Sequence, residues 1–198
     1  MTDADAAVAA IEAGELAIIP TDTVYGLAAT PHAEEAVRRL YRAKGRVDAQ
    51  PTALVVRDLD ALRECLPELT GAQERVAQAL LPGPYTLILP NPTRRFPWLA
   101  GSRPETIGVR IPDVTGVVAE LLGRVGVVAA TSANLHGGAD PRRLADVPHE
   151  LVEAAAAVLD TGELLGMPST VVDLTGPEPR ILREGAIPAA KALARLRE

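Results

Sequence analysis

Short apolar runs alternate with segments of helical periodicity along the whole chain, and this alternation restricts the fold more than any other feature. The runs at 15–20, 52–56 and 85–89 are typical of buried strands, whereas 33–44 places its apolar residues at helical spacing. Strands that alternate with helices predict an α/β fold in which the helices flank a central sheet.

The expected elements follow from this pattern. The expected strands are 15–20, 52–56, 85–89, 106–111, 126–131, 157–160, 170–174 and 180–184. The expected helices are 4–13, 33–44, two within 58–80 that break near Pro67, 114–123, one after a loop within 143–155, and 188–197. Three closely spaced strands near the end of the chain suggest antiparallel pairs, so we expect a mixed sheet.

The organisation of the chain is simple. No internal repeat, low-complexity tract or linker is visible, so residues 1–198 are expected to form one domain. The segment 90–105 is the best candidate for a long, mobile loop. A length of 198 residues with 47% hydrophobic residues is enough for a sizeable core.

Charge and cysteine content exclude several classes of protein. The net charge of -6 argues against general attraction to nucleic acid, so an anionic ligand needs a local basic patch. Cys65 is the single cysteine, which excludes an intramolecular disulfide and favours a reduced, cytoplasmic setting. No apolar run is long enough to span a membrane, and the first residues do not resemble a signal peptide. The scattered histidines have no zinc-binding spacing, so no metal site in the protein is expected.

Two polar segments directly follow apolar strands, where ligands bind in α/β sheets. The segment 21–26 (TDTVYG) supplies hydroxyls, a carboxylate and a phenol, and an ordinary turn explains it about equally well. The segment 131–134 (TSAN) suits hydrogen bonding to phosphate or ribose, although a helix N-cap would use the same residues.

Two further segments carry cations. Lys44 and Arg46 stand at a helix end, where they either complement the helix dipole or clamp a phosphate. Of 20 basic residues only Lys44 and Lys191 are lysine, which favours a specific role for Lys44. Ser169 opens an apolar strand through β-propensity or function, and Arg183 at a strand end could bind an anion. The standard phosphate-binding loops and the nucleophile elbow are absent, so a nucleotide would bind without them.

Six segments in this order resemble the YrdC/YciO family of L-threonylcarbamoyladenylate synthases over nearly the full length. They are IIPTDTVYGLAA at 18–29, YRAKGR with Pro51 at 41–51, LLPGPYTLIL at 80–89, TIGVRIPD at 106–113, VVAATSAN at 127–134, and PSTVVDLTG with ILREGAI at 168–187. Because the sequence ends after the catalytic-type domain, it resembles the short form of the family. Asp22, Gln50 and Thr52 depart from the usual pattern, in which Glu, a Lys, His or Asn, and an apolar residue are common.

The resemblance implies a YrdC-like α/β domain with a twisted mixed sheet and a concave basic groove. It also implies a nucleotidyltransferase that forms threonylcarbamoyl-AMP and pyrophosphate from ATP, L-threonine and bicarbonate. Mg²⁺ is expected with ATP, because it bridges phosphate oxygens, and no organic cofactor is expected. Expected partners are proteins that transfer the threonylcarbamoyl group to tRNA, with weak RNA binding at most and no membrane association.

The resemblance also assigns roles to residues. Lys44 and Arg46 are expected to be catalytic through the phosphates. The complete expected ATP and phosphate set is Lys44, Arg46, Ser132, Asn134, Ser169 and Arg183. The expected threonine set is Thr21, Thr23, Tyr25 and Arg110, with Arg110 facing the substrate carboxylate.

Other functions are weaker alternatives. An RNA-binding YrdC-like module without synthase activity would need aromatic residues for stacking, and only 3% of the chain is aromatic. A steep salt dependence of RNA binding would favour this module. A carbamoyltransferase of the hydrogenase-maturation type needs further domains, and a purely structural protein leaves the ordered polar segments unexplained.

Overall fold

The computed structural model describes residues 2–45 and 50–196. Its strands form one nine-stranded sheet in the order β7-β1-β2-β6-β3-β5-β4-β8-β9. The strands are β1 Ala17–Ile19, β2 Gly26–Ala29, β3 Ala53–Val56, β4 Tyr85–Pro90, β5 Thr106–Arg110, β6 Val127–Ser132, β7 Ala157–Val158, β8 Thr170–Asp173 and β9 Arg180–Arg183. The α-helices are α1 Asp3–Glu12, α2 Glu34–Ala43, α3 Leu59–Cys65, α4 Gly71–Leu80, α5 Gly116–Val125, α6 His149–Ala154 and α7 Ala189–Arg195.

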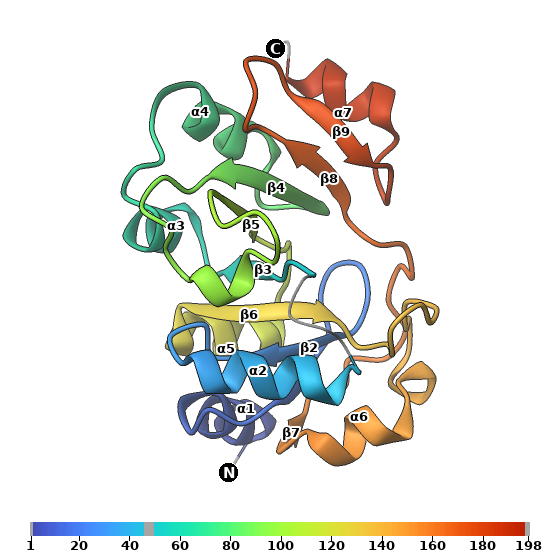
Figure 1. The fold of residues 1–198 in the computed structure, drawn as a ribbon. Helices are drawn as coiled ribbons and strands as arrows, with labels where there is room; N and C mark the ends of the chain where they lie inside the picture. Colours follow the sequence, from blue (N-terminus) through green and yellow to red (C-terminus); the bar gives the residue numbers. More distant parts are fainter. Residues whose placement is uncertain (1, 46–49, 197–198) are drawn as a thin grey trace.

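The sheet is mixed, as expected. Neighbouring strands pair in parallel at β7–β1, β3–β5 and β4–β8, and the remaining pairs are antiparallel. α1 and β7 lie at the lower end of the molecule, and β8, β9 and α7 lie at the upper end (Figure 1). β6 and β3 join these two halves in the middle of the sheet.

Two expectations about the strands were wrong. β2 was not expected, because all its residues are buried and its small side chains carry no alternation of polar and apolar character. The strand near 157–160 does not pair with β8, because it joins β1 in parallel at the opposite edge of the sheet. Residues 159–169 instead carry the chain across to β8, so only β8 and β9 form the expected antiparallel pair.

The segment 90–105 is fastened to the rest of the molecule at several points. It contains a 3-10 helix, η1 (Pro97–Leu99), and a second 3-10 helix, η2 (Leu144–Asp146), lies before α6. Trp98 Nε1 donates to the Pro31 carbonyl at 2.9 Å, and Asn91 Nδ2 donates to the Arg95 carbonyl at 2.9 Å. The segment is therefore a packed connection, which differs from the mobile loop expected from its sequence.

Side chains alternate between the two faces of the sheet, as strand geometry requires. One face packs on α1 and α5 through Ala17 and Ile19 of β1 and Val128 of β6. The opposite face packs on α2, α3, α4, α6 and α7 and forms the larger core cluster. Among the described residues, no helix combines the length and apolar character needed to cross a membrane.

Candidate active site

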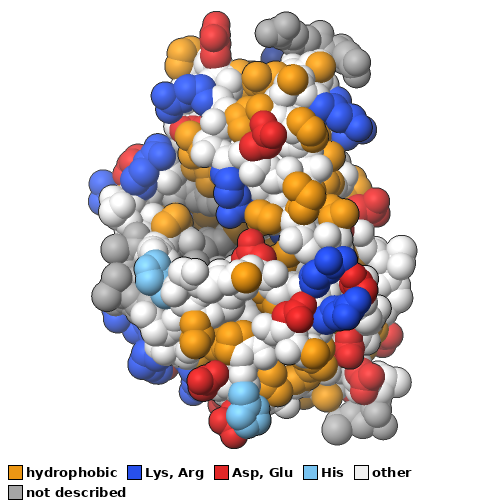
Figure 2. Space-filling view, turned by 90° about the vertical axis from the view of Figure 1, so that its right-hand side faces the viewer, with side chains coloured by type: hydrophobic (Ala, Val, Ile, Leu, Met, Phe, Trp, Pro, Cys, Tyr) orange, Lys and Arg blue, Asp and Glu red, His pale blue; other side chains and the backbone are white. Residues whose placement is uncertain are grey.

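A cavity of about 290 Å³ lies on the sheet face that α1 and α5 cover only in part. Val55 and Ala130 belong both to the α1–α5 cluster and to the cavity wall, so the cavity continues where helix coverage ends. The cavity reaches down to the sheet because three neighbouring residues on adjacent strands, Ala53, Ala130 and Gly108, have small side chains or none. The surface is hollowed on the side seen in Figure 2, and a basic side chain lies beside the hollow.

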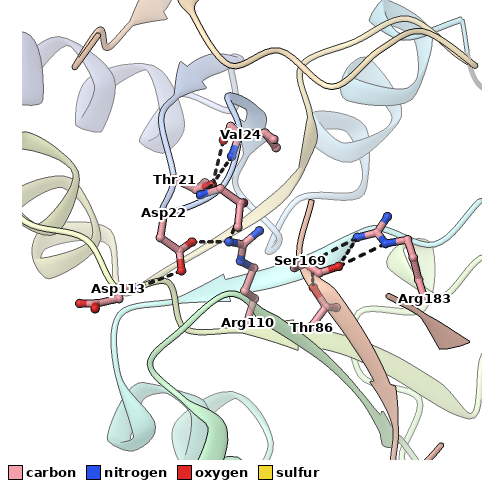
Figure 3. A network of polar contacts seen from close by, with 9 residues as sticks. Thr21, Asp22, Val24, Thr86, Arg110, Asp113, Ser169 and Arg183 are labelled. Atoms are coloured by element: carbon pink, nitrogen blue, oxygen red, sulfur yellow. Dashed lines mark hydrogen bonds and ion pairs between the residues drawn. The ribbon is translucent and has the colours of Figure 1, made fainter. Parts of the chain in front are cut away.

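The segment 21–26 forms one wall through a network of buried hydroxyls. Thr21 Oγ1 donates to the Val24 carbonyl at 2.8 Å and lies 3.0 Å from Thr23 Oγ1. Arg110 Nη2 donates to Thr23 Oγ1 at 2.8 Å and forms an ion pair with Asp22 (Figure 3). The segment 21–26 is therefore a turn that also forms part of the cavity wall, because its residues Asp22 and Thr23 hold Arg110.

Arg110 is charged and has one donor without a hydrogen-bond partner. Burial lowers the pKa of its guanidinium and Asp22 opposes this shift, so the side chain stays charged. Arg110 Nε is buried without a hydrogen-bond partner, and the residue lines the cavity. An unpartnered buried donor of this kind is costly, unless a bound anion accepts from it.

Lys44 supports the loop after β6. It follows α2, is 0% exposed, and its Nζ donates to the Ser132 carbonyl and to Asn134 Oδ1, the latter at 2.9 Å. Ser132 Oγ also donates to Asn134 Oδ1, at 2.8 Å. Ser132 is on the cavity wall, so Lys44 stands behind it and fixes both the carbonyl and the amide.

A third cluster joins β4, β8 and β9. Ser169 Oγ lies 2.7 Å from Thr86 Oγ1, and Arg183 Nη2 donates to the Ser169 carbonyl at 2.9 Å (Figure 3). Gly185 allows this close approach, because a Cβ there would collide with the Pro168 carbonyl. Thr86, Ser169 and Arg183 thereby form the wall opposite the segment 21–26.

Tyr25 is not brought to the cavity. Its side chain is 0% exposed, and its OH lies 2.5 Å from Asp160 Oδ1 and 2.7 Å from the Gly162 carbonyl. Burial and the bond to Asp160 raise the pKa of the phenol, while that bond lowers the pKa of Asp160, so the phenol donates and the carboxylate accepts. Tyr25 therefore anchors the connection between β7 and β8 instead of lining the expected threonine pocket.

Most of the predicted site residues converge. Those on the cavity wall are Thr21, Arg110, Ser132, Ser169 and Arg183. Thr23 bonds directly to Arg110, and Lys44 and Asn134 bond to Ser132. Arg46 lies outside the described residues, so its role stays a prediction.

Thr86, Asp22 and Asp140 are among the wall and network residues that were not predicted as site residues. Thr86 could have been found, because its polar side chain alternates with buried apolar residues in the strand 85–89. Asp22 could also have been found, since it stands between two predicted threonines. Asp140 lines the cavity near Ser132, and nothing in its sequence context marks it.

The acidic side chains of the cavity wall determine which kind of cation the cavity could bind. Within residues 2–45 and 50–196, no three His, Cys, Asp or Glu side chains are grouped to hold a metal. Mg²⁺ bound with a nucleotide needs only one or two carboxylates, since phosphate oxygens and water complete its shell. Asp140 is the one carboxylate on the described part of the cavity wall, and this arrangement fits Mg²⁺ that arrives with ATP.

Comparisons with known proteins assign the sequence and the fold to one family. The profile described as "Telomere recombination", which covers Sua5, YciO and YrdC proteins, matches residues 9–185. The chain is 34% identical over 181 residues to a threonylcarbamoyl-AMP synthase from Pyrococcus abyssi, covering 90% of this chain and 52% of that protein. It therefore spans about half the length of this curated relative.

Solved structures agree. P. abyssi Sua5 complexed with L-threonine superposes with a TM-score of 0.89 at 31% identity, covering 98% of this chain and 58% of that one. YciO from Escherichia coli superposes with a TM-score of 0.82 at 26% identity, covering 96% of this chain and 91% of that one. The expected α/β fold with a mixed sheet is confirmed, and the chain belongs to the Sua5/YciO/YrdC family.

Proposed function

We propose that this chain is an L-threonylcarbamoyladenylate synthase, a nucleotidyltransferase that acts in tRNA threonylcarbamoyladenosine modification. The observation that carries the proposal is the cavity, where hydroxyls and cations from four separate segments meet on an otherwise apolar sheet face. Family membership supports it, as do the relative named threonylcarbamoyl-AMP synthase and the solved relative that holds L-threonine.

The proposed reaction joins three substrates. The amine of L-threonine attacks carbon dioxide, which forms from bicarbonate by loss of hydroxide, and the amine loses a proton. The products of this step are a carbamate and water. A carbamate oxygen then attacks the α-phosphate of ATP as the bond to the β-phosphate oxygen breaks. Threonylcarbamoyl-AMP and pyrophosphate leave. The protein contributes position and charge neutralisation, since the transfer needs no covalent side chain.

At the threonine end, Arg110 is the proposed partner of the substrate carboxylate. Its Nη2 is held by Thr23 and Asp22, so the guanidinium is fixed before substrate arrives. Its unpartnered Nε is the donor left for the carboxylate. Thr21 and Thr23 shape this end, and their mutual bond restricts which hydroxyl can reach the ligand.

At the nucleotide end, Arg183 and Ser169 are proposed to contact the nucleotide and Ser132 and Asn134 the phosphates. Lys44 acts here through position and charge, because it fixes the Ser132 carbonyl and the Asn134 amide from behind the wall. Arg46 is proposed to contact the phosphates directly. Mg²⁺ with ATP supplies further neutralisation of phosphate charge.

The proposed partners follow from the product. Threonylcarbamoyl-AMP would pass to proteins that modify tRNA in the cytoplasm, with at most weak direct RNA binding by this chain. The alternative RNA-binding module has less support, because Tyr25, Tyr41 and Tyr85 are all buried. Only Phe96 and Trp98 remain for stacking on bases, and both are partly buried.

Pyrophosphate release from ATP and Mg²⁺ tests the proposal, measured with and without L-threonine and bicarbonate. We expect release that requires both. Arg110→Gln should raise the KM for threonine, whereas the same change at the exposed Arg75 should leave it unchanged. A folded protein that binds nucleotide but releases no pyrophosphate would contradict the synthase, and RNA binding at several salt concentrations would be the next measurement.

A further inference from the structure

Asp140 is an acidic group in a cavity whose other charged wall residues, within the described part of the chain, are Arg110 and Arg183. Its carboxylate forms no ion pair with any described side chain, and its one hydrogen bond to a described residue is long. Asn134 Nδ2 lies 3.4 Å from Asp140 Oδ1, while the same nitrogen donates to the Gly138 carbonyl at 2.7 Å. Asp140 thus keeps most of its hydrogen-bonding and charge capacity for something in the cavity.

The contact between Asn134 and Asp140 shows at which end of the cavity Asp140 lies. Its Oδ1 accepts from Lys44 and Ser132, which directs its Nδ2 towards Asp140. Asp140 therefore adjoins the group of side chains that the proposed function places around the phosphates.

A carboxylate at this place repels ATP and the carbamate of threonine. ATP is an anion, and threonine carries a carboxylate and, once its amine has become a carbamate, no ammonium. A like charge within a few ångströms opposes binding, unless a cation lies between the two. Mg²⁺ bound to a nucleotide commonly takes one carboxylate from the protein, directly or through water.

We infer that Asp140 is the protein group that holds the Mg²⁺ carried by ATP, which makes it a binding residue that the sequence did not reveal. The inference rests on the proposed function. Asp140 also gives the cavity selectivity for the metal-bound nucleotide, because it rejects ATP that arrives without a metal.

Titration calorimetry of ATP with Mg²⁺, and separately with EDTA, tests this on the intact chain. For the unchanged protein we expect Mg²⁺ to strengthen ATP binding. For Asp140→Asn we expect at least about a tenfold loss of this strengthening, together with about threefold tighter binding of metal-free ATP because the repulsion is gone. Asp140→Glu should recover part of the Mg²⁺ effect. Asp3→Asn, the same change at an exposed position of α1, should behave as the unchanged protein.

Three results with the Asp140→Asn variant would overturn the inference. Asp140→Asn that retains the full Mg²⁺ effect removes the metal contact. Equal weakening of both forms of ATP shows that Asp140 only positions Asn134. Weaker threonine binding with an intact Mg²⁺ effect assigns the carboxylate to the substrate amine. An unchanged protein that shows no Mg²⁺ effect yet releases pyrophosphate would sink this inference and leave the proposed function standing, whereas no ATP binding at all would overturn both.

Discussion

Two hollows formed by described residues lie at opposite ends of β6, and they differ in how many of their polar atoms have hydrogen-bond partners. The active-site cavity reaches Ser132 at the end of β6, whereas a larger hollow of about 550 Å³ reaches Val127 at its start. We call the second hollow the aromatic groove. It is lined by His32, Ala61, Glu64, Cys65, Arg95, Phe96, Trp98, Val125, Gly126 and Val127.

Two of the polar side chains in the aromatic groove, those of Trp98 and Arg95, have hydrogen-bond partners. Trp98 Nε1 donates to the Pro31 carbonyl, and Arg95 Nε donates to Glu68 at 3.1 Å. The rings of His32 and Phe96 pack on each other at 5.6 Å. Burial raises the pKa of Cys65, so its thiol is not activated as a nucleophile.

The active-site cavity is smaller, but more of the residues that line it have a buried polar atom without a hydrogen-bond partner. Among the described residues, three buried side-chain atoms lack partners, at Thr52, Tyr85 and Arg110, and two of these residues line this cavity and none lines the groove. This unused hydrogen-bonding capacity, and not volume, favours the smaller cavity as the candidate ligand site.

The largest effect is expected for Lys44→Met. Methionine has similar length and fills the buried space, but it cannot hold the Ser132 carbonyl or the Asn134 amide. We expect kcat/KM for pyrophosphate release to fall about 100-fold, since the loss of one preorganised donor costs about 3 kcal/mol. Lys44→Glu is a poorer test, because it would bury an unpaired carboxylate against a carbonyl and destabilise the fold. A fall of less than about fivefold would remove Lys44 from the mechanism.

Trp98→Ala tests whether the aromatic groove has a structural role and does not bind substrate. Trp98 is half-buried against the main core, so its loss should lower the free energy of unfolding by about 2–3 kcal/mol in urea titrations. Pyrophosphate release by the remaining folded protein should stay within about twofold of normal. A marked loss of ATP or threonine affinity would show that the groove binds substrate and would break the comparison.

Tyr25→Phe and Tyr41→Phe form a matched pair across the two regions. Tyr25 OH bonds Asp160 beside the cavity, and Tyr41 OH donates to the Trp98 carbonyl at 3.0 Å beside the groove. Each variant should lose about 1 kcal/mol of stability, because each removes a buried hydrogen bond. Neither should change the KM for threonine. If Tyr25→Phe raised that KM tenfold without loss of stability, Tyr25 would return to the threonine pocket where the sequence resemblance put it.

The sequence predicts the elements well and the contacts between them less well. The break near Pro67 and the mixed sheet were found, because proline and local periodicity act over a few residues. β2 was missed, and β7 was expected beside β8, because burial on both faces and long-range pairing leave no local signal.

The same limit applies to the site. Motif order indicated which residues gather at the cavity, yet it could not separate those on the wall from those that stand behind it. Lys44 and Tyr25 are buried supports, and that distinction depends on partners 88 and 135 residues away in the chain. Asp140 was missed because only its spatial neighbours in the folded cavity, and not its sequence neighbours, point to a role.

The smallest effect is expected for Thr52→Val, which asks whether every unused polar atom near the cavity is reserved for ligand. Thr52 lies just before β3, two positions from Leu54, and the alternation of that strand directs its side chain towards the core face. Valine has the same shape and removes a buried hydroxyl without a partner. We therefore expect thermal and urea unfolding to show a gain of up to about 1 kcal/mol, with ATP and threonine affinities unchanged. A gain in stability with weaker ligand binding would instead show that the Thr52 hydroxyl contacts substrate. Thr52 would then be a second unpartnered donor for substrate beside Arg110 Nε, because loss of a hydroxyl that does not contact the ligand should leave affinity unchanged.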